Sequence, residues 1–304
     1  MPTWRKVMRM FLVLGHNYSY TDLDSLISSV VLAEIWSASG RPARAVLLDP
    51  KGIKASSLKI LEIIGNVGLP DVVTKEDLEK ADLILVDHND PEESYGKLGL
   101  DKTPSMVIDH HLDIGAPAGC KIIEQVGSTC TLVAEISHEE EVRLTDRQAR
   151  ALVFAIVSDT RGLKGRKTSE RDIAAVNRLY RENNIPESVE AITEMVLQPI
   201  DVRNMPVEAI LGNSLKEYLS GRIGIAAIET ADESYQERLE EILENARRTS
   251  YDLYVFVILK THIMETEIFY FDRVFRLFPE KERRSGLISR GKELIPEIME
   301  KIQR

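Results

Sequence analysis

Acidic or histidine residues follow the short apolar runs in the first two thirds of this chain, and this pattern limits the folds open to it more than any other feature. The candidate strands are Met10–Leu14, Ala43–Leu48, Leu83–Val86 and Ser105–Ile108. Helical patterns alternate with these runs, which indicates βαβ units and a parallel sheet. His16, Asp87 and Asp109 stand at the ends of three of the runs. Because open α/β sheets bind ligands at the carboxyl ends of their strands, we expect a site at this edge.

The chain is long enough for two domains. At 304 residues it exceeds the size at which one hydrophobic core usually suffices. We place residues 1–198 in an α/β domain with a parallel, Rossmann-like sheet and residues 206–304 in a smaller α/β domain with a mixed sheet. The boundary region Gln198–Pro206 contains two prolines and little periodic pattern. Further expected elements are helices at Leu26–Ile35, Thr129–Ser137, Asp146–Val157, Ser169–Asn183 and Ser234–Arg248, a last helix from about Pro296, and strands at Ile223–Ile228, Leu253–Lys260 and Glu267–Phe271.

Composition argues against several classes of protein. The net charge of -10 disfavours stable nucleic-acid binding through a blanket of Lys and Arg. The negative charge does not exclude a small phosphorylated substrate, because bound cations reverse the electrostatic field where such a substrate would bind. No apolar run approaches the roughly 20 residues of a membrane span. Cys120 and Cys130 are too few for a disulfide framework, so we expect two core thiols and a cytoplasmic location. The oligomeric state stays open, with a homodimer among the alternatives.

Four clusters of polar residues lie where strands or helices are expected to begin or end. They are His16 with Asp22-Leu23-Asp24, Asp87-His88-Asn89, Asp109-His110-His111 and Ser158-Asp159-Thr160. Carboxylate oxygen suits hard divalent cations and imidazole suits manganese, iron, cobalt or zinc, so this set without thiolate indicates a hydrolytic metal site. Two such ions about 3.5–4 Å apart can bridge one water, lower its pKa and present hydroxide to phosphorus. We expect two divalent ions, with manganese first and cobalt or magnesium as alternatives.

Three of the four clusters also have a purely structural interpretation. Asp22 and Asp24 before a helix can act as an N-cap and a first-turn charge. Asp87 can form a turn at a strand end. Asp159 can simply end a helix, although a negative charge there opposes the helix dipole. Two consecutive histidines after an apolar strand, at positions 110 and 111, serve packing poorly, so the four clusters together favour a functional site.

The order of these motifs resembles the DHH phosphoesterase superfamily. An N-terminal His…Asp-x-Asp is followed by the motifs that begin at Asp87, Asp109 and Ser158. The stretches Ser214–Tyr218 and Ile288–Lys292 resemble the second domain of manganese-dependent family II inorganic pyrophosphatases and related exopolyphosphatases. The likeness covers nearly the whole chain. It implies a metal-dependent hydrolase whose active site lies in a cleft between the two domains.

The resemblance also implies a ligand set for each metal ion. The ligands of one ion would be His16, Asp22 and Asp87. The ligands of the other would be Asp24, Asp87, His110 and Asp159. Asp87 would therefore bridge the two ions. His88 and Asp109 would orient the ligands without touching the metals.

Substrate contacts follow from the same resemblance. His111 would face the substrate and donate a proton or hydrogen bond to its phosphate, which makes Asp87 and His111 the catalytic residues. Three cations of the second domain, Lys216, Arg290 and Lys292, would bind the far phosphate.

Two further segments can be interpreted either as structural or as part of the site. Gly127-Ser128-Thr129 before a helix can lend backbone N–H groups to an oxyanion or can serve as a plain helix cap. The basic run with Lys164, Arg166 and Lys167 can be a solvated loop or can line the cleft.

The chain departs from the family pattern at two places. The first motif normally runs His-x-Asn-Pro-Asp-x-Asp, whereas the interval Asn17–Thr21 lacks the proline and adds two residues. The loop must bulge if His16 is still to bind metal, and a longer loop costs little chain entropy. Gly291 stands where the pyrophosphatases usually carry lysine, which leaves Lys292 one place late.

Three functions compete on this basis. The leading hypothesis is hydrolysis of a phosphoanhydride, pyrophosphate first and short polyphosphate next, by a hydroxide that bridges two metal ions. The second is a DHH phosphodiesterase for short oligonucleotides or nucleotides; the glycine-rich GGGH-type motif of such relatives is missing, although Tyr18 and Tyr20 could stack on a base. The third is a phosphate-binding relative whose catalysis weakened when its first motif changed.

Overall fold

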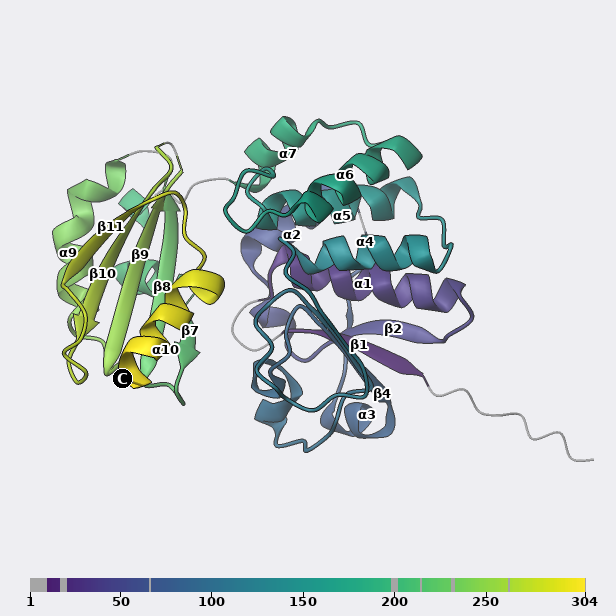
Figure 1. The fold of residues 1–304 in the computed structure, drawn as a ribbon, viewed down its shortest axis with the longest axis horizontal. Helices are drawn as coiled ribbons and strands as arrows, with labels where there is room; N and C mark the ends of the chain where they lie inside the picture. Colours follow the sequence, from purple (N-terminus) through teal and green to yellow (C-terminus); the bar gives the residue numbers. More distant parts are fainter. Residues whose placement is uncertain are drawn as a thin grey trace, which may run out of the picture. The chain divides into compact units, whose positions relative to one another are not determined.

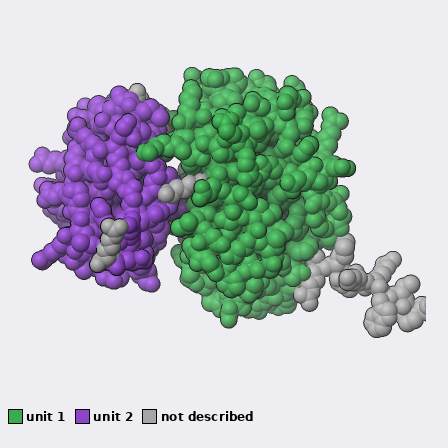
Figure 2. All heavy atoms as spheres, in the orientation of Figure 1, with its two compact units in different colours: residues 1–197 green, residues 198–304 purple. Residues whose placement is uncertain are grey.

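Two compact units, residues 1–197 and residues 198–304, make up the computed structural model of this chain (Figure 2). The structure describes residues 10–16, 21–65, 67–197, 202–213, 215–230, 233–261 and 263–303. The expected boundary region, Gln198–Pro206, falls partly on residues 198–201, which lie outside the described part. Val202 is buried in the core of the second unit, so that core includes residues before position 206.

The first unit is built on a six-stranded parallel sheet in the order β3-β2-β1-β4-β5-β6. Its strands are β1 (Phe11–Gly15), β2 (Ala43–Leu47), β3 (Asp71–Val72), β4 (Asp82–Val86), β5 (Met106–Asp109) and β6 (Lys121–Ile123). All four predicted strands are present. The sequence analysis missed β3 and β6 because each is two or three residues long and neither is fully buried.

Helices cover both faces of this sheet. They are α1 (Leu23–Ala38), α2 (Ala55–Ile64), α3 (Lys75–Lys80), α4 (Thr129–Glu139), α5 (Asp146–Asp159), α6 (Glu170–Glu182) and α7 (Val189–Val196), with 3-10 turns η1 (Pro50–Gly52), η2 (Pro91–Glu93) and η3 (Tyr95–Leu98). Helix α1 is buried almost all round, because it contacts β1 and β2 on one side and α4 and α5 on the other. Figure 1 shows α1, α4, α5 and α6 on one side of the sheet and α3 on the other.

The strand order reverses between β1 and β4. The chain runs outward from β1 to β3 at one edge, then returns to β4 beside β1 and runs outward to β6. Connections that leave the ends of β1 and β4 therefore diverge, which is the place where open α/β sheets bind ligands. His16 directly follows β1, and Asp87 directly follows β4.

The second unit has a mixed sheet in the order β11-β10-β9-β8-β7. Its strands are β7 (Lys216–Tyr218), β8 (Ile223–Thr230), β9 (Leu253–Lys260), β10 (Glu265–Asp272) and β11 (Lys281–Ser285), and β8 and β9 form the parallel pair. Its helical elements are η4 (Val202–Asn204), α8 (Val207–Leu211), η5 (Ser234–Arg238), α9 (Leu239–Ala246), the π-turn η6 (Arg290–Leu294) and α10 (Ile295–Gln303). Helices α8 and α9 pack on one face of the sheet and α10 on the other. The predicted fold, a parallel-sheet unit followed by a smaller unit with a mixed sheet, is confirmed.

The cysteines differ in their environments. Cys130 is buried in α4, as expected of a core thiol. The same prediction is wrong for Cys120, which is exposed because it precedes the half-buried edge strand β6. Among the described residues, no helix combines the length and the apolarity that crossing a membrane requires.

Candidate metal centre

The first ligand group forms around His16 at the end of β1. His16 Nε2 lies 3.2 Å from Asp87 Oδ2 and 3.5 Å from Asp22 Oδ1. Residues 17–20 of the lengthened first motif lie outside the described part of the chain, so the expected bulge and the two tyrosines there are not described. Thr21 is described, and its hydroxyl donates to the His16 carbonyl at 3.1 Å. The longer motif thus still brings His16 and Asp22 together.

Asp22 fills a structural role as well. It is the N-cap of α1, and its Oδ1 accepts a hydrogen bond from the Ser25 backbone N–H at 3.2 Å. The N-cap and ligand interpretations of Asp22 are therefore compatible in one side chain.

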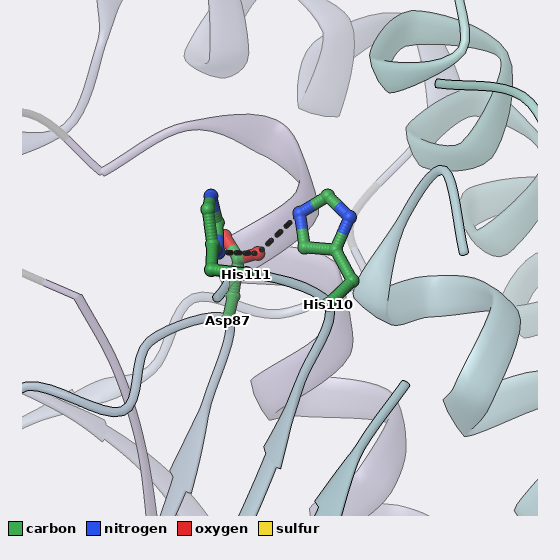
Figure 3. Close-up of side chains that lie close together, drawn as sticks. All are labelled: Asp87, His110 and His111. Carbon is green, nitrogen blue, oxygen red and sulfur yellow. Dashed lines mark ion pairs between the residues drawn. The ribbon is translucent and has the colours of Figure 1, made fainter. Parts of the chain in front are cut away.

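The second ligand group forms around His110, which follows β5. His110 Nε2 lies 3.4 Å from Asp87 Oδ1, 3.6 Å from Asp159 Oδ2 and 3.9 Å from Asp24 Oδ2. Figure 3 shows the imidazole of His110 turned toward the Asp87 carboxylate. The potential ligand atoms of Asp24, His110 and Asp159 lie within 4.8 Å of one another, and so do those of His16, Asp22 and Asp87.

Asp87 stands between the two groups and is strained. Its Oδ2 faces His16, and its Oδ1 faces His110 and also accepts a hydrogen bond from Thr129 Oγ1 at 3.1 Å. Its backbone φ is 62°, in the left-handed region that residues other than glycine adopt at a cost. Backbone strain of this kind concentrates at functional sites, which agrees with a role for Asp87 beyond forming a turn.

The two consecutive histidines are held in different ways. His110 Nδ1 lies 3.2 Å from the Val126 carbonyl, to which it can only donate, so Nε2 keeps its lone pair for a metal ion. His111 Nδ1 lies 2.8 Å from Asp109 Oδ1 and 3.9 Å from Asp87 Oδ1. Figure 3 shows that the other ring nitrogen of His111 points away from Asp87. The His111 side chain is 34% exposed.

Asp109 organises the turn that carries both histidines. Its Oδ1 accepts from the backbone N–H groups of His110 and His111, and its Oδ2 accepts from Asn89 Nδ2 at 2.6 Å. His88 is held by Nδ1, which bonds the Val86 carbonyl at 2.9 Å, and by Nε2, which lies 2.7 Å from Ser94 Oγ. Its ring lies edge-on to that of His16, with the ring centroids 6.5 Å apart. Asp109 thus contacts a site histidine by hydrogen bonds, whereas His88 contacts one through its ring.

The N-terminus of α4 binds a carboxylate of the protein itself. Asp24 accepts hydrogen bonds from Ser128 Oγ at 2.6 Å, Thr129 N at 2.8 Å and Cys130 N at 2.9 Å. Of the three backbone N–H groups of Gly127-Ser128-Thr129, that of Thr129 donates to Asp24 and that of Gly127 donates to Asp172, so two of them already bind carboxylates of the chain. Ser128 is also the N-cap of α4, as the alternative interpretation expected.

Asp172 is a buried residue of this region that the sequence analysis missed. It accepts from Gly127 N at 2.8 and 3.0 Å, from Thr131 Oγ1 at 2.6 Å and from Ser169 N at 2.7 Å. A Cβ at Gly127 would lie 2.4 Å from Thr160 Cγ2, so only glycine fits there. The local signal for Asp172 was its place three residues after Ser169, which completes the capping box of α6.

Electrostatics show that the residues fit divalent cations. Burial and the nearby carboxylates of Asp87 and Asp159 raise the pKa of Asp24 well above its usual range. Burial opposes charge on Asp87 too, but hydrogen bonds to His110 and His16 outweigh it and hold the pKa of Asp87 well below its usual range. Burial also raises the pKa of Cys130, as in a structural core thiol. Crowded carboxylates with imidazole and no thiolate suit manganese-type ions, which would relieve the repulsion.

The three expected phosphate-binding cations belong to the second unit. Lys216 begins β7, and Arg290 opens the π-turn η6 with its Nη1 3.3 Å from the Ile225 carbonyl. The side chain of Lys292 lies outside what the structure describes.

Sequence comparison assigns the segment that carries most of this centre. Residues 10–156 match the sequence model of the DHH family, N-terminal domain. This segment is similar to the N-terminal domain of the DHH family. Every potential ligand named above lies within residues 10–156 except Asp159, three residues beyond the match at the end of α5.

Several known proteins resemble the chain along nearly its whole length. A Staphylococcus saprophyticus protein named "Probable manganese-dependent inorganic pyrophosphatase" is 26% identical over 314 residues, which cover 95% of this chain and 97% of that protein. A Staphylococcus aureus protein of the same name is 26% identical over 309 residues with the same coverage.

Two solved structures share the fold of nearly the whole chain. One is a Methanococcus jannaschii protein provisionally named a family II inorganic pyrophosphatase, with a TM-score of 0.78, 24% identity, and coverage of 97% of this chain and 100% of that one. The other is an exopolyphosphatase-related protein from Bacteroides fragilis, with a TM-score of 0.50, 13% identity, and coverage of 97% and 92%. The predicted resemblance to the DHH superfamily and to family II inorganic pyrophosphatases is confirmed.

Proposed function

We propose that this protein is a metal-dependent phosphohydrolase that cleaves a phosphoanhydride, with inorganic pyrophosphate as the first candidate substrate and short polyphosphate as the next. The observation that carries the proposal is the position of Asp87, whose two carboxylate oxygens face two separate groups of potential ligands. The names of the staphylococcal relatives support pyrophosphate and manganese.

Two divalent ions, with manganese preferred, fit the two groups. One would be bound by His16, Asp22 and Asp87. The other would be bound by Asp24, Asp87, His110 and Asp159. When bound, such a pair lowers the pKa of a shared water and neutralises charge on the phosphate oxygens. The strand ends and the termini of α1 and α5 hold these donors in place, so the ligands need little reorganisation when the ions bind.

His111 and the cations of the second unit would act on the substrate. Asp109 Oδ1 holds His111 Nδ1, and the other ring nitrogen of His111 would donate a hydrogen bond to a phosphate oxygen. Lys216, Arg290 and Lys292 would bind the far phosphate, as the resemblance implies.

A substrate panel tests the proposal. Purified protein is loaded with manganese, and phosphate release is measured from pyrophosphate, tripolyphosphate and polyphosphate, with cleavage of dinucleotides measured in parallel. We expect pyrophosphate to give the highest kcat/KM and dinucleotides to remain intact. Cleavage of dinucleotides without phosphate release from pyrophosphate would favour a phosphodiesterase. Binding of phosphate compounds without any turnover would favour a phosphate sensor.

A further inference from the structure

We propose that Lys167 is an internal cation that competes with the metal ion bound at Asp159. Its ammonium group neutralises Asp159 when that metal is absent and must leave when the metal arrives. The proposal rests on the two-ion centre inferred above and concerns only how tightly the Asp24–His110–Asp159 group binds its ion.

The loop after α5 is folded so that Lys167 returns to the end of that helix. Arg161, Gly162 and Leu163 all have positive φ, of 52°, 72° and 60°. The Gly165 backbone N–H then donates to the Thr160 carbonyl at 2.8 Å. A Cβ at position 165 would lie 2.8 Å from that same oxygen, so glycine permits the close return. This tight turn carries Lys167 back beside Asp159, eight residues earlier in the chain.

The contact uses the oxygen that a metal ion would need. Lys167 Nζ donates to Asp159 Oδ2, and the same oxygen lies 3.6 Å from His110 Nε2. Carboxylate oxygens approach transition-metal ions to about 2.0–2.2 Å. An ammonium group in hydrogen-bond contact with that oxygen therefore takes up one of the directions from which the oxygen can bind a metal ion.

Partial burial makes this ion pair stronger than an ordinary surface pair. The Lys167 and Asp159 side chains are 21% and 24% exposed. The charge of Lys167 is also one of the influences that lower the pKa of His110, after burial and His111. Lys164, on the same loop, is exposed to solvent. The two lysines thus carry the same charge, but only Lys167 is paired with a potential ligand.

The test is manganese binding to the metal-free protein, measured by titration calorimetry. The variants are Lys167→Gln, Lys167→Arg and Lys164→Gln, and circular dichroism checks that each is folded. We expect Lys167→Gln to tighten the weaker of two manganese constants about 5- to 10-fold, because the competing ion pair is gone. Lys167→Arg keeps the charge and Lys164→Gln changes an exposed one, so both should stay within about twofold of the wild type.

The sign of the change decides between roles for Lys167. Unchanged or weaker manganese binding in Lys167→Gln would overturn the proposal, because a lysine that merely orients Asp159 helps the metal rather than competing with it. Equal tightening in Lys164→Gln would overturn it too, because the effect would then be one of net charge. If the wild type bound fewer than two ions, the proposed function would fail together with this inference. If the wild type binds two ions and hydrolyses pyrophosphate, the result for Lys167→Gln tests the inference on Lys167 alone.

Discussion

His16 Nε2 lies 3.2 Å from Asp87 Oδ2, across the ends of the neighbouring strands β1 and β4. The strand order reverses between these two strands, so both side chains leave the sheet where its connections diverge. Topology alone therefore brings together two residues that are far apart in sequence. The contact is present although the first motif is two residues longer than in the family pattern.

His16 should be essential for one of the two ions. Replacing it in His16→Ala removes the only imidazole of the group formed with Asp22 and Asp87. We expect manganese content to fall from two ions per chain toward one, because the group around His110 is untouched. Metal analysis after gel filtration measures this, and a variant that retains both ions would show that His16 is not a ligand.

Asp109 should affect the rate more than the metal content. In Asp109→Asn the acceptor of His111 Nδ1 is weakened, and an amide faces Asn89 Nδ2 in place of a carboxylate. We expect kcat to fall about 10- to 100-fold, the usual range for groups that orient a site, with two manganese ions retained. Steady-state kinetics with metal analysis measure both quantities. A loss of bound manganese, with activity reduced in proportion to the metal lost, would point to a direct metal role instead.

Asp172 should matter for folding. In Asp172→Asn the side chain presents an amide group toward the donors of Gly127, Thr131 and Ser169, and some of these buried donors lose their acceptor. Each unsatisfied donor costs about 1–3 kcal/mol, so we expect the free energy of unfolding to fall by about 2–5 kcal/mol. Urea denaturation measures this. The exposed Asp146→Asn serves as the matched control and should change stability by less than about 1 kcal/mol.

Lys292 should act on substrate affinity. If it binds the far phosphate, Lys292→Gln removes a charge-assisted hydrogen bond worth about 1.5–3 kcal/mol, which corresponds to a KM for pyrophosphate raised about tenfold or more. The manganese content should stay at two ions per chain. An unchanged KM would show that the lysine beside Gly291 does not replace the one expected at that position.

Much of the fold was predictable because it depends on local patterns. Apolar runs and helical periodicity predicted the four longer strands of the first sheet and the polar residues at their ends. The edge strands β3 and β6 were not predictable, because neither forms an apolar run.

The partners of the site residues were less predictable than the residues themselves. Asp24 accepts hydrogen bonds from residues more than 100 positions later, and Asp172 bonds Gly127 across 45 positions. The sequence pattern shows that Asp172 can cap α6. Its hydrogen bonds to Gly127 and Thr131 form only once α4 and α6 pack together, so no local pattern predicts them. The contact of Lys167 depends on the left-handed turn at residues 161–163. Of these three residues only Gly162 is of a type that indicates positive φ in a sequence.

The most direct test of the account is the manganese-dependent hydrolysis of pyrophosphate by Asp87→Asn, compared with the wild type. Asparagine keeps the size of the side chain but removes the charge that faces both ligand groups. The account predicts manganese-dependent phosphate release by the wild type and a kcat/KM at least about 100-fold lower in the variant, more than the loss of an orienting group costs. Near-normal turnover by Asp87→Asn would contradict it.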